Sequence, residues 1–327
     1  MKKVASVVFL TALMALLVVG AAFSDEWKPK RTIELIAPGG PGGGYDMLCR
    51  TVQKTLTDEK LVDKNIVVVN KPGGGGTIGW RYLAGKKGRG EYLAATSTLI
   101  MLNNLLGKTD MTYHDITPIA SLQTEWISIA VKADSPWKTV KDLFDAIKTD
   151  PTGVPIAVGP TLGNNDHLVF LQLADFYGID PASVNFIVYP EAGGAIVPAV
   201  LGGHAKATVI GLAEVLEQHK AKNLRILGVS SEKTLSFLPD VKSFTEQGAD
   251  VVFPHWRGFL GAPGLTPAQI HYWDDVLSKM VQTPTWKQLI ANLGWDSYYR
   301  NSEGFTQLLE KQTASFDTLL TKVGLKD

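Results

Sequence analysis

The sequence contains very little cysteine: Cys49 is the only one among 327 residues. A single thiol excludes an intramolecular disulfide bond and a cluster of thiolate metal ligands. Cys49 falls inside a predicted helix, and no histidine stands in a motif beside it, so we interpret it as a buried, inert thiol rather than a nucleophile. The fold must therefore be stabilised by its hydrophobic core and not by cross-links.

An excess of charge of either sign is also absent. The chain has 32 basic and 32 acidic residues and a formal net charge of zero, which gives no electrostatic footprint for nucleic acid. A bound anion would therefore have to be held by local geometry. Hydrophobic residues make up 45% and charged residues 20%, as in globular proteins, and the length suffices for two lobes of ordinary size.

Motifs for catalysis and metal binding are missing as well. The sequence has no Gly-x-Ser-x-Gly elbow and no His-Glu-x-x-His pair, and its six histidines are scattered. We therefore expect no catalytic residue, no metal site and no cofactor. The glycine loops also fail the nucleotide patterns. From Gly40, the third glycine of a dinucleotide motif would fall at Tyr45, and the loop 71–76 lacks the terminal Lys-Ser/Thr of a P-loop.

The first 24 residues have the pattern of a cleavable secretory signal peptide. Lys2 and Lys3 precede an apolar, uncharged run over residues 4–20, and Ala22 and Ser24 supply small residues for a signal peptidase. The alternative is an uncleaved membrane anchor, which is less favoured because the apolar run is short for a span. We expect export to the periplasm.

Residues 33–46 are typical of an apolar strand, a glycine loop and the start of an amphipathic helix. The first backbone N–H groups of such a helix have no intrahelical partner, and together with the helix dipole they favour an anion. Two later stretches, 157–166 and 190–195, repeat the arrangement. We expect these loops to converge on a small carboxylate, because each of its oxygens accepts more than one hydrogen bond.

Repeated strand–helix units predict an open, doubly wound α/β fold. We expect strand 66–70 to be covered on both faces, because it is uninterruptedly apolar. The chain should form two lobes, with residues 25–125 and 234–327 in lobe I and residues 126–233 in lobe II. The expected strands are 32–37, 66–70, 91–96, 126–132, 155–159, 185–188, 206–210, 225–230, 251–253 and 256–261, and the expected helices are 45–56, 77–83, 99–106, 140–148, 166–177, 195–201, 211–222, 267–281 and 302–323.

The glycine loops all follow predicted strands. In open α/β sheets, ligands bind beyond the carboxyl ends of the strands, where loops meet helix N-termini. The loops of two lobes can thus face one cleft that closes by hinge motion. The alternative is turn chemistry alone, since glycine adopts positive φ without steric cost.

Several residues near these loops have either a structural role or a role in ligand binding. Asp46 either stabilises the helix dipole and orients its loop, or it holds a water or a ligand hydroxyl. Asp166 is a favourable first-turn residue, and His167 is interpreted as a packed or loop-bonding histidine rather than a base. Trp256 and Arg257 alternate faces on a strand. Either Trp256 packs in the core while Arg257 pairs with an acid, or Trp256 forms a cleft wall and Arg257 meets the ligand.

Motifs along nearly the whole exported chain resemble those of the periplasmic solute receptors of tripartite tricarboxylate transporters, a Bug-type receptor family. The sequences Gly-Gly-Gly-Tyr-Asp, Asp-His and Trp-Arg-Gly are more similar to the citrate-receptor branch than to amino-acid-binding relatives. In their order along the chain, the motifs are residues 41–46, 70–74, 159–167, 201–204, 238–241 and 256–258.

The resemblance implies a two-lobed periplasmic binding protein of type II, a "Venus flytrap", with each lobe an open, mostly parallel sheet flanked by helices. It also implies integral membrane partner subunits and a ligand carboxylate gripped by the first βα loop, partly through ordered waters, and by two loops of lobe II. We expect a monomer. With Ser97 and Trp256 added, the candidate ligand-binding residues are Gly43, Gly44, Tyr45, Asp46, Ser97, Thr161, Gly163, Asn164, Asn165, Asp166, Gly193, Gly194 and Trp256.

Two departures from the family pattern concern the ligand. Gly159-Pro160 stands where many relatives have Gly-Ser, which removes one N–H and one hydroxyl, and Pro190-Glu191 places an acid beside the third loop. We therefore expect a receptor for a small carboxylate of the di- or tricarboxylate class, without assuming citrate, that binds, closes and docks on a transporter. Two alternatives stay open: a sensor for a membrane signalling partner and an exported hydrolase.

Overall fold

The computed structural model describes residues 26–159, 162–189, 193–322 and 324–326. The predicted signal peptide, Thr161 and the Pro190-Glu191 pair lie outside these residues. Among the helices in the described ranges, none is both long enough and apolar enough to cross a membrane.

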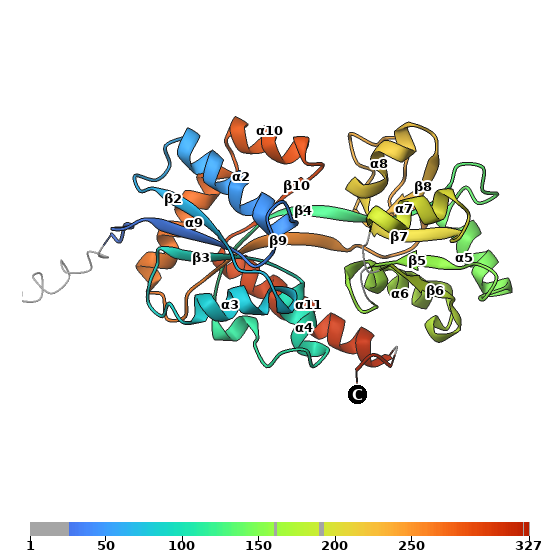
Figure 1. Ribbon diagram of the computed structural model, residues 1–327, viewed down its shortest axis with the longest axis horizontal. Coiled ribbons are helices and arrows are strands. Elements are labelled where there is room, and N and C mark those ends of the chain that lie inside the picture. The colour runs from blue at the N-terminus through green and yellow to red at the C-terminus, as the bar shows by residue number, and fades with distance from the viewer. Residues whose placement is uncertain (1–25, 160–161, 190–192, 323, 327) are drawn as a thin grey trace, which may run out of the picture.

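The molecule has two lobes that lie side by side and are connected by long strands (Figure 1). The strands of the first lobe are β1 (Ile33–Ala37), β2 (Ile66–Asn70), β3 (Tyr92–Ser97), β4 (Thr117–Lys132), β9 (Pro254–Gly261) and β10 (Asp296–Arg300). They follow the order β2-β1-β3-β9-β4, and β10 pairs with β4. β1 is parallel to β2 and β3, whereas β9 is antiparallel to β3 and β4. The helices of this lobe are α2 (Gly44–Asp58), α3 (Thr77–Ala84), α4 (Leu99–Leu105), α9 (Pro267–Met280), α10 (Pro284–Asn292) and α11 (Ser302–Lys322).

The second lobe repeats this organisation on a smaller scale. Its own strands are β5 (Ile156–Val158), β6 (Phe186–Val188), β7 (Ala207–Gly211) and β8 (Leu224–Val229). β5 is parallel to β6 and β7, and both β7 and β8 are antiparallel to β4. The flanking helices are α5 (Val140–Thr149), α6 (Asn165–Tyr177), α7 (Gly193–Leu201) and α8 (Leu212–Lys220).

Strand β4 belongs to both lobes and changes partners along its sixteen residues. Residues 117–126 pair with β9, and residues 127–132 pair with β7 and β8. Because β4 pairs with strands of both lobes, the chain passes from lobe I into lobe II along this strand. The boundaries expected from the sequence, residues 25–125 with 234–327 for lobe I and 126–233 for lobe II, stay a prediction.

Helix α2 illustrates how the strand-end loops are held in place. Leu48, Val52 and Leu56 recur at every fourth position and are fully buried against the sheet. Burial of each such side chain stabilises the fold by about 1.5–3 kcal/mol. The helix is thus fixed along its length, and its N-terminus is kept at the carboxyl end of β1.

Most expected elements are confirmed, with shifts of one or two residues at their ends, but four expectations are wrong. Residues 251–253 pack as irregular chain before β9 and form no strand. The chain end contains α10 and β10 in addition to the two expected helices, and the strand expected at 126–132 begins nine residues earlier. β2, which lies at the edge of the sheet, is not covered on both faces, because Val67 is 41% exposed.

Candidate ligand-binding cleft

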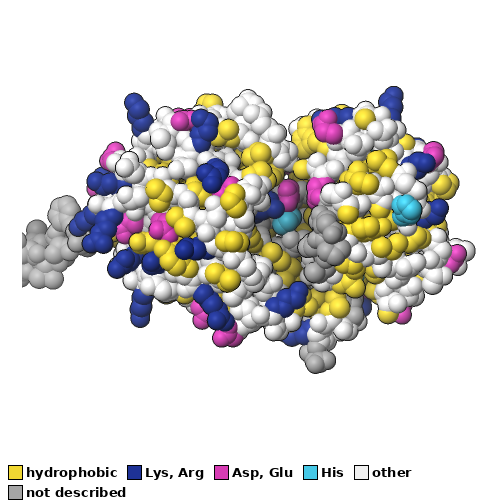
Figure 2. All heavy atoms as spheres, in the orientation of Figure 1, with side chains coloured by type: hydrophobic (Ala, Val, Ile, Leu, Met, Phe, Trp, Pro, Cys, Tyr) yellow, Lys and Arg dark blue, Asp and Glu magenta, His cyan; other side chains and the backbone are white. Residues whose placement is uncertain are grey.

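A cavity of about 590 Å³ lies between the lobes, beyond the carboxyl ends of the parallel strands. Its lining residues come from the loops of both lobes and from the connecting strands β4 and β9. In the space-filling view, acidic, basic and histidine side chains meet in the hollow between the two lobes (Figure 2). This is the place where the topology of open α/β sheets puts a ligand.

Helix α2 points its N-terminus at the cavity. Its first two residues, Gly44 and Tyr45, line the cavity, and no side chain caps the helix at Gly43. The Tyr45 hydroxyl lies 2.7 Å from Ser97 Oγ at the end of β3, and burial raises the pKa of Tyr45 to about 12. An uncharged hydroxyl therefore stands beside helix N–H groups that lack an intrahelical partner, a combination that suits an anion.

Asp46 supports this loop from behind. Its Oδ2 accepts hydrogen bonds from the Gly42 N–H at 2.9 Å and from Arg50 Nε at 2.8 Å, and Oδ1 accepts from Asn70 Nδ2 at 3.0 Å. The bond from Arg50 is the main cause that lowers the pKa of Asp46 to about 2, against the effect of burial. Asp46 is 2% exposed and is not a lining residue. The contacts match the interpretation of an acid that orients the glycine loop.

The two lobes contact each other at the edge of the cavity. Thr98, which precedes α4, donates from Oγ1 to Asn165 Oδ1 at 2.5 Å, and both side chains are buried. Asn165 is the first residue of α6. The bond therefore links the start of a helix in one lobe to the start of a helix in the other.

The N-terminus of α6 is organised by His167. The His167 N–H donates to Asn164 Oδ1 at 3.0 Å, and the Gly163 N–H donates to His167 Nδ1 at 2.9 Å. Burial lowers the pKa of His167 to about 4, in agreement with a ring nitrogen that accepts a hydrogen bond. His167 is thus a loop-bonding histidine, and Gly163 supports the loop without lining the cavity.

Glu125 on β4 forms a charged cluster at the floor of the cavity with His255 and Arg257 on β9. Arg257 Nη2 donates to Glu125 Oε1 at 2.9 Å, and His255 Nδ1 lies 3.1 Å from the same oxygen. Burial opposes the charge on Glu125, but Arg257 and then His255 outweigh it and hold its pKa below the ordinary value. Burial also lowers the pKa of His255. The described residues contain no group of three or more His, Cys, Asp or Glu side chains placed to hold a metal ion.

Among the described residues, one donor of Arg257 has no protein acceptor. Its side chain is 12% exposed, and Nη1 is buried without a hydrogen-bond partner among the described residues. The guanidinium lies against Gly44, where an added Cβ would come within 2.7 Å of Nη2. Arg257 and the N-terminus of α2 therefore border the same part of the cavity, and both favour a carboxylate there.

Trp256 lies in the core and not in the cavity wall. It is fully buried, its Nε1 donates to Gln312 Oε1 at 2.6 Å, and its ring meets Phe305 edge to face at 5.0 Å between centroids. Successive side chains of a strand point to opposite faces, so Trp256 packs on α11 while Arg257 faces the cavity. The candidate role of Trp256 as a cleft wall is replaced by a role in the core.

The other candidate residues fall into three groups. Gly43 precedes α2 and, like Asp46 and Gly163, is not a lining residue. Gly193 is the first residue of α7, and the exposed Gly194 is not a lining residue, whereas Thr161 lies outside the described residues. The candidates that the structure brings together around the cavity are Gly44, Tyr45, Ser97, Asn164, Asn165 and Asp166.

Several lining residues were missed or left out of the candidates. Glu125 is the only acid in a largely buried strand, a signal for a functional or paired group, but the expected strand began one residue after it. Glu214 follows Gly211 at the end of β7, which is a further strand–glycine–helix junction. The polar lining residues outside the candidate list are Asn103, Lys108, Glu125, Glu214, His255 and Arg257, of which Arg257 had been considered from the sequence as an ion-pair partner or a ligand contact.

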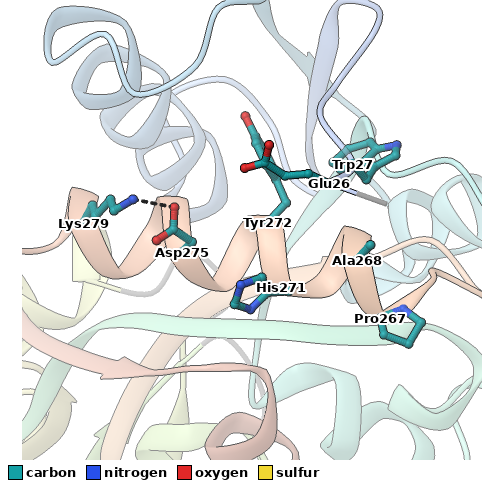
Figure 3. Close-up of a pocket in the computed structure, with 8 residues that line it drawn as sticks. All are labelled: Glu26, Trp27, Pro267, Ala268, His271, Tyr272, Asp275 and Lys279. Carbon is teal, nitrogen blue, oxygen red and sulfur yellow. Dashed lines mark hydrogen bonds and ion pairs between the residues drawn. The ribbon is translucent and has the colours of Figure 1, made fainter. Parts of the chain in front are cut away.

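A second hollow lies where the N-terminal segment crosses helix α9 (Figure 3). Glu26 and Trp27 form one side, and the Lys279–Asp275 ion pair, at 2.6 Å, lies on α9 at the other. No strand-end loop contributes to this hollow. The N-terminus of α9 borders this hollow, but it is capped by the Thr266 side chain, whereas that of α2 at the interlobe cavity has no side-chain cap among the described residues. We therefore assign the ligand to the interlobe cavity.

Comparison with known proteins adds a family match. The model of the tripartite tricarboxylate transporter family receptor matches residues 48–325. A solved solute-binding protein from Polaromonas, which carries no ligand, is 29% identical, with a TM-score of 0.80 over 90% of this chain and 99% of the other.

Two solved structures from Rhodopseudomonas palustris have the same fold. The MatC protein, with bound malate, is 16% identical, with a TM-score of 0.70 over 89% of this chain and 99% of that one. A second protein, with adipate, is 19% identical, with a TM-score of 0.74 over 90% of this chain and 98% of that one.

Proposed function

Because the chain belongs to the tripartite tricarboxylate transporter receptor family, we propose that it captures a small organic carboxylate between its lobes and delivers it to a transporter of the tripartite tricarboxylate type. The ligand is a di- or tricarboxylate. The receptor works by binding, lobe closure and docking on integral membrane subunits, without covalent chemistry.

One observation carries the proposal: two unrelated anion-binding features border the same part of the cavity. The N-terminus of α2 has no side-chain cap, and Arg257 Nη1 is buried without a protein partner among the described residues. A carboxylate accepts hydrogen bonds from both, and the Tyr45 hydroxyl adds a third donor. Direct and water-mediated contacts of this kind give micromolar affinity, roughly −8 kcal/mol.

The ligand class is supported by the fold relatives. Two proteins with the same fold hold malate and adipate, which are both dicarboxylates. On the side of lobe I, we propose that the ligand contacts Gly44, Tyr45 and Ser97, with Gly43 and Asp46 shaping their loop. On the side of lobe II, the proposed contacts are Asn164, Asn165 and Asp166, with Gly163 supporting their loop, and Thr161, Gly193 and Gly194 stay candidates from the sequence alone.

The cellular setting follows from the leader and the family. We propose that residues 1–24 direct export to the periplasm and are then removed. A receptor in this compartment raises the local ligand concentration at the transporter. We propose that it acts as a monomer. Uptake of the labelled ligand should stop when the receptor gene is deleted and should return with the wild type but not with Tyr45→Ala.

A thermal-shift screen tests the binding step directly. The melting temperature should rise by several degrees with succinate, adipate, malate or citrate at about a hundredfold excess over Kd, since ligand binding then adds about 2.7 kcal/mol of stability. Calorimetry should detect no binding to a folded Tyr45→Ala protein, and mass spectrometry should recover the ligand unchanged. No shift with any acid at millimolar concentration contradicts the proposal.

A further inference from the structure

Among the acids that line the cavity, Asp166 has few interactions that would stabilise a negative charge. Asp166 lines the cavity from the first turn of α6. The Asn164 amide approaches its Oδ2 only at 3.5 Å, which is the long limit for a hydrogen bond. In the part of the chain that the structure describes, no basic side chain forms an ion pair with it. An ionised Asp166 is therefore poorly compensated.

The surroundings of Asp166 are unfavourable for a negative charge. Burial raises the pKa of Asp166 well above its ordinary range, and the negative charges of Glu214 and then Glu125 raise it further. The N-terminus of α6 and the Asn164 amide act in the opposite direction but are outweighed. The charged and titratable groups of the other elements around the cavity are Tyr45 on α2, Lys108 after α4, Glu125 on β4, Glu214 on α8, and His255 and Arg257 on β9.

The two lobes present different groups to the cavity. Arg257 and the uncapped N-terminus of α2 offer donors for one carboxylate. At the lobe II side, Asp166 projects from α6. A ligand held by both lobes would place its second polar group next to Asp166. Whether Asp166 is ionised or neutral then decides whether that group is a cation or a carboxylate.

We propose that Asp166 recognises the second carboxylate of a dicarboxylate ligand as a neutral carboxylic acid, which donates its proton in a hydrogen bond to the ligand. This inference rests on the proposed function. The proton comes from solvent: Asp166 binds it before the ligand enters or, where Asp166 is still ionised, as the ligand enters, and no other bond is made or broken. One shared proton converts the repulsion between two carboxylates into a charge-assisted hydrogen bond.

Linkage gives the proposal a measurable signature. If binding takes up a proton, affinity must increase as the pH falls, by up to tenfold per pH unit between the pKa values of Asp166 in the free and bound proteins. Burial lowers the pKa of His255, which favours its uncharged form in the free protein, and any contribution of His255 to the pH dependence is retained in an Asp166 variant. An amide at position 166 also donates to a carboxylate but cannot titrate.

The experiment is calorimetry of succinate and adipate binding to the full exported chain at pH 6.5, 7.25 and 8, in buffers of different ionisation enthalpy. For the wild type we expect proton uptake that increases with pH toward one per ligand at pH 8 and a Kd that rises more than threefold across this range. Asp166→Asn should bind with a Kd that no longer changes with pH and without proton uptake. Asp142→Asn makes the same change in the first turn of α5, away from the cavity, and should behave as the wild type does.

Three outcomes overturn the inference. One is dicarboxylate binding by the wild type without proton uptake. Another is a pH dependence that persists in a folded Asp166→Asn protein. The third is tighter binding of 4-aminobutyrate than of succinate without proton uptake, because Asp166 would then be an ionised partner for an ammonium group. The absence of any carboxylate binding would instead reject the proposed function together with the inference.

Discussion

The guanidinium of Arg257 occupies the space in which a side chain at position 44 would lie. An added Cβ on Gly44 would be 2.7 Å from Nη2 and 2.8 Å from Cζ and Nε of Arg257. The glycine is thus required by a close approach between the first residue of α2 and a residue of β9. This contact connects the glycine loop of lobe I to the charged cluster on the strands between the lobes.

Replacement of Gly44 by alanine should therefore weaken ligand binding. The methyl group must displace Arg257 or the start of α2, and overpacking of this kind costs about 1–3 kcal/mol. We expect dicarboxylate affinity to fall at least tenfold in calorimetry, in a protein that remains folded. Gly40→Ala changes the same loop where no atom lies within 4 Å of the added Cβ, and it should bind as the wild type does. Equal affinities for the two variants would show that the contact does not matter.

Arg257→Met should destabilise the protein in a pH-dependent manner. The substitution leaves Glu125, whose side chain is 16% exposed, without its main cationic partner, and such an unpaired buried charge costs about 3–5 kcal/mol. Arg257 lowers the pKa of Glu125 against the effect of burial, so its removal raises that pKa. The stability deficit should then be largest at neutral pH and should shrink as the pH falls and Glu125 is protonated.

Urea unfolding at pH 7 and pH 5 measures this deficit. Glu125→Gln combined with Arg257→Met removes the uncompensated charge and should recover part of the lost stability. A deficit of equal size at both pH values and in the double variant would indicate lost packing and no electrostatic role.

Asp46→Asn should reduce stability without changing the lining of the cavity. The pKa of Asp46 is lowered to about 2, from an ordinary value of 3.8, so the ionised form stabilises the native state above pH 4. The contribution is at most about 2 kcal/mol at neutral pH, because its partner Arg50 is exposed and screened by solvent. It is lost as the pH falls through about 2. The free energy of unfolding should differ between wild type and variant at pH 7, and the difference should decrease at pH 3.

The loop half of the cavity was predictable from the sequence because its determinants are local. Gly44, Tyr45 and Asn164 each lie within a few residues of the strand end and the helix start that position them. The pattern strand, glycine loop, helix is written in consecutive residues, and parallel strands bring such loops to one edge of the sheet.

The floor of the cavity was not predictable in the same way. Glu125 and Arg257 are separated by 132 positions and meet only through the register of β4 against β9, in which Glu125 is opposite His255. A one-residue slip would turn each of these side chains to the other face. For the same reason the role of Trp256 stayed ambiguous. Side chains alternate along a strand, so the sequence predicts that Trp256 and Arg257 point to opposite faces, but it does not tell which of the two faces the ligand.

Trp256→Phe distinguishes the core role from the cleft role. The smaller ring leaves space beside Phe305 and removes the donor to Gln312, so the free energy of unfolding should fall by about 1–3 kcal/mol. Ligand affinity should change less than twofold, because Arg257, the next residue, keeps its contacts with Glu125 and Gly44. Urea unfolding and calorimetry on the same preparation measure both quantities. A large loss of affinity with little change in stability would return Trp256 to the ligand site and would mean that α11, which covers this face, moves when the lobes close.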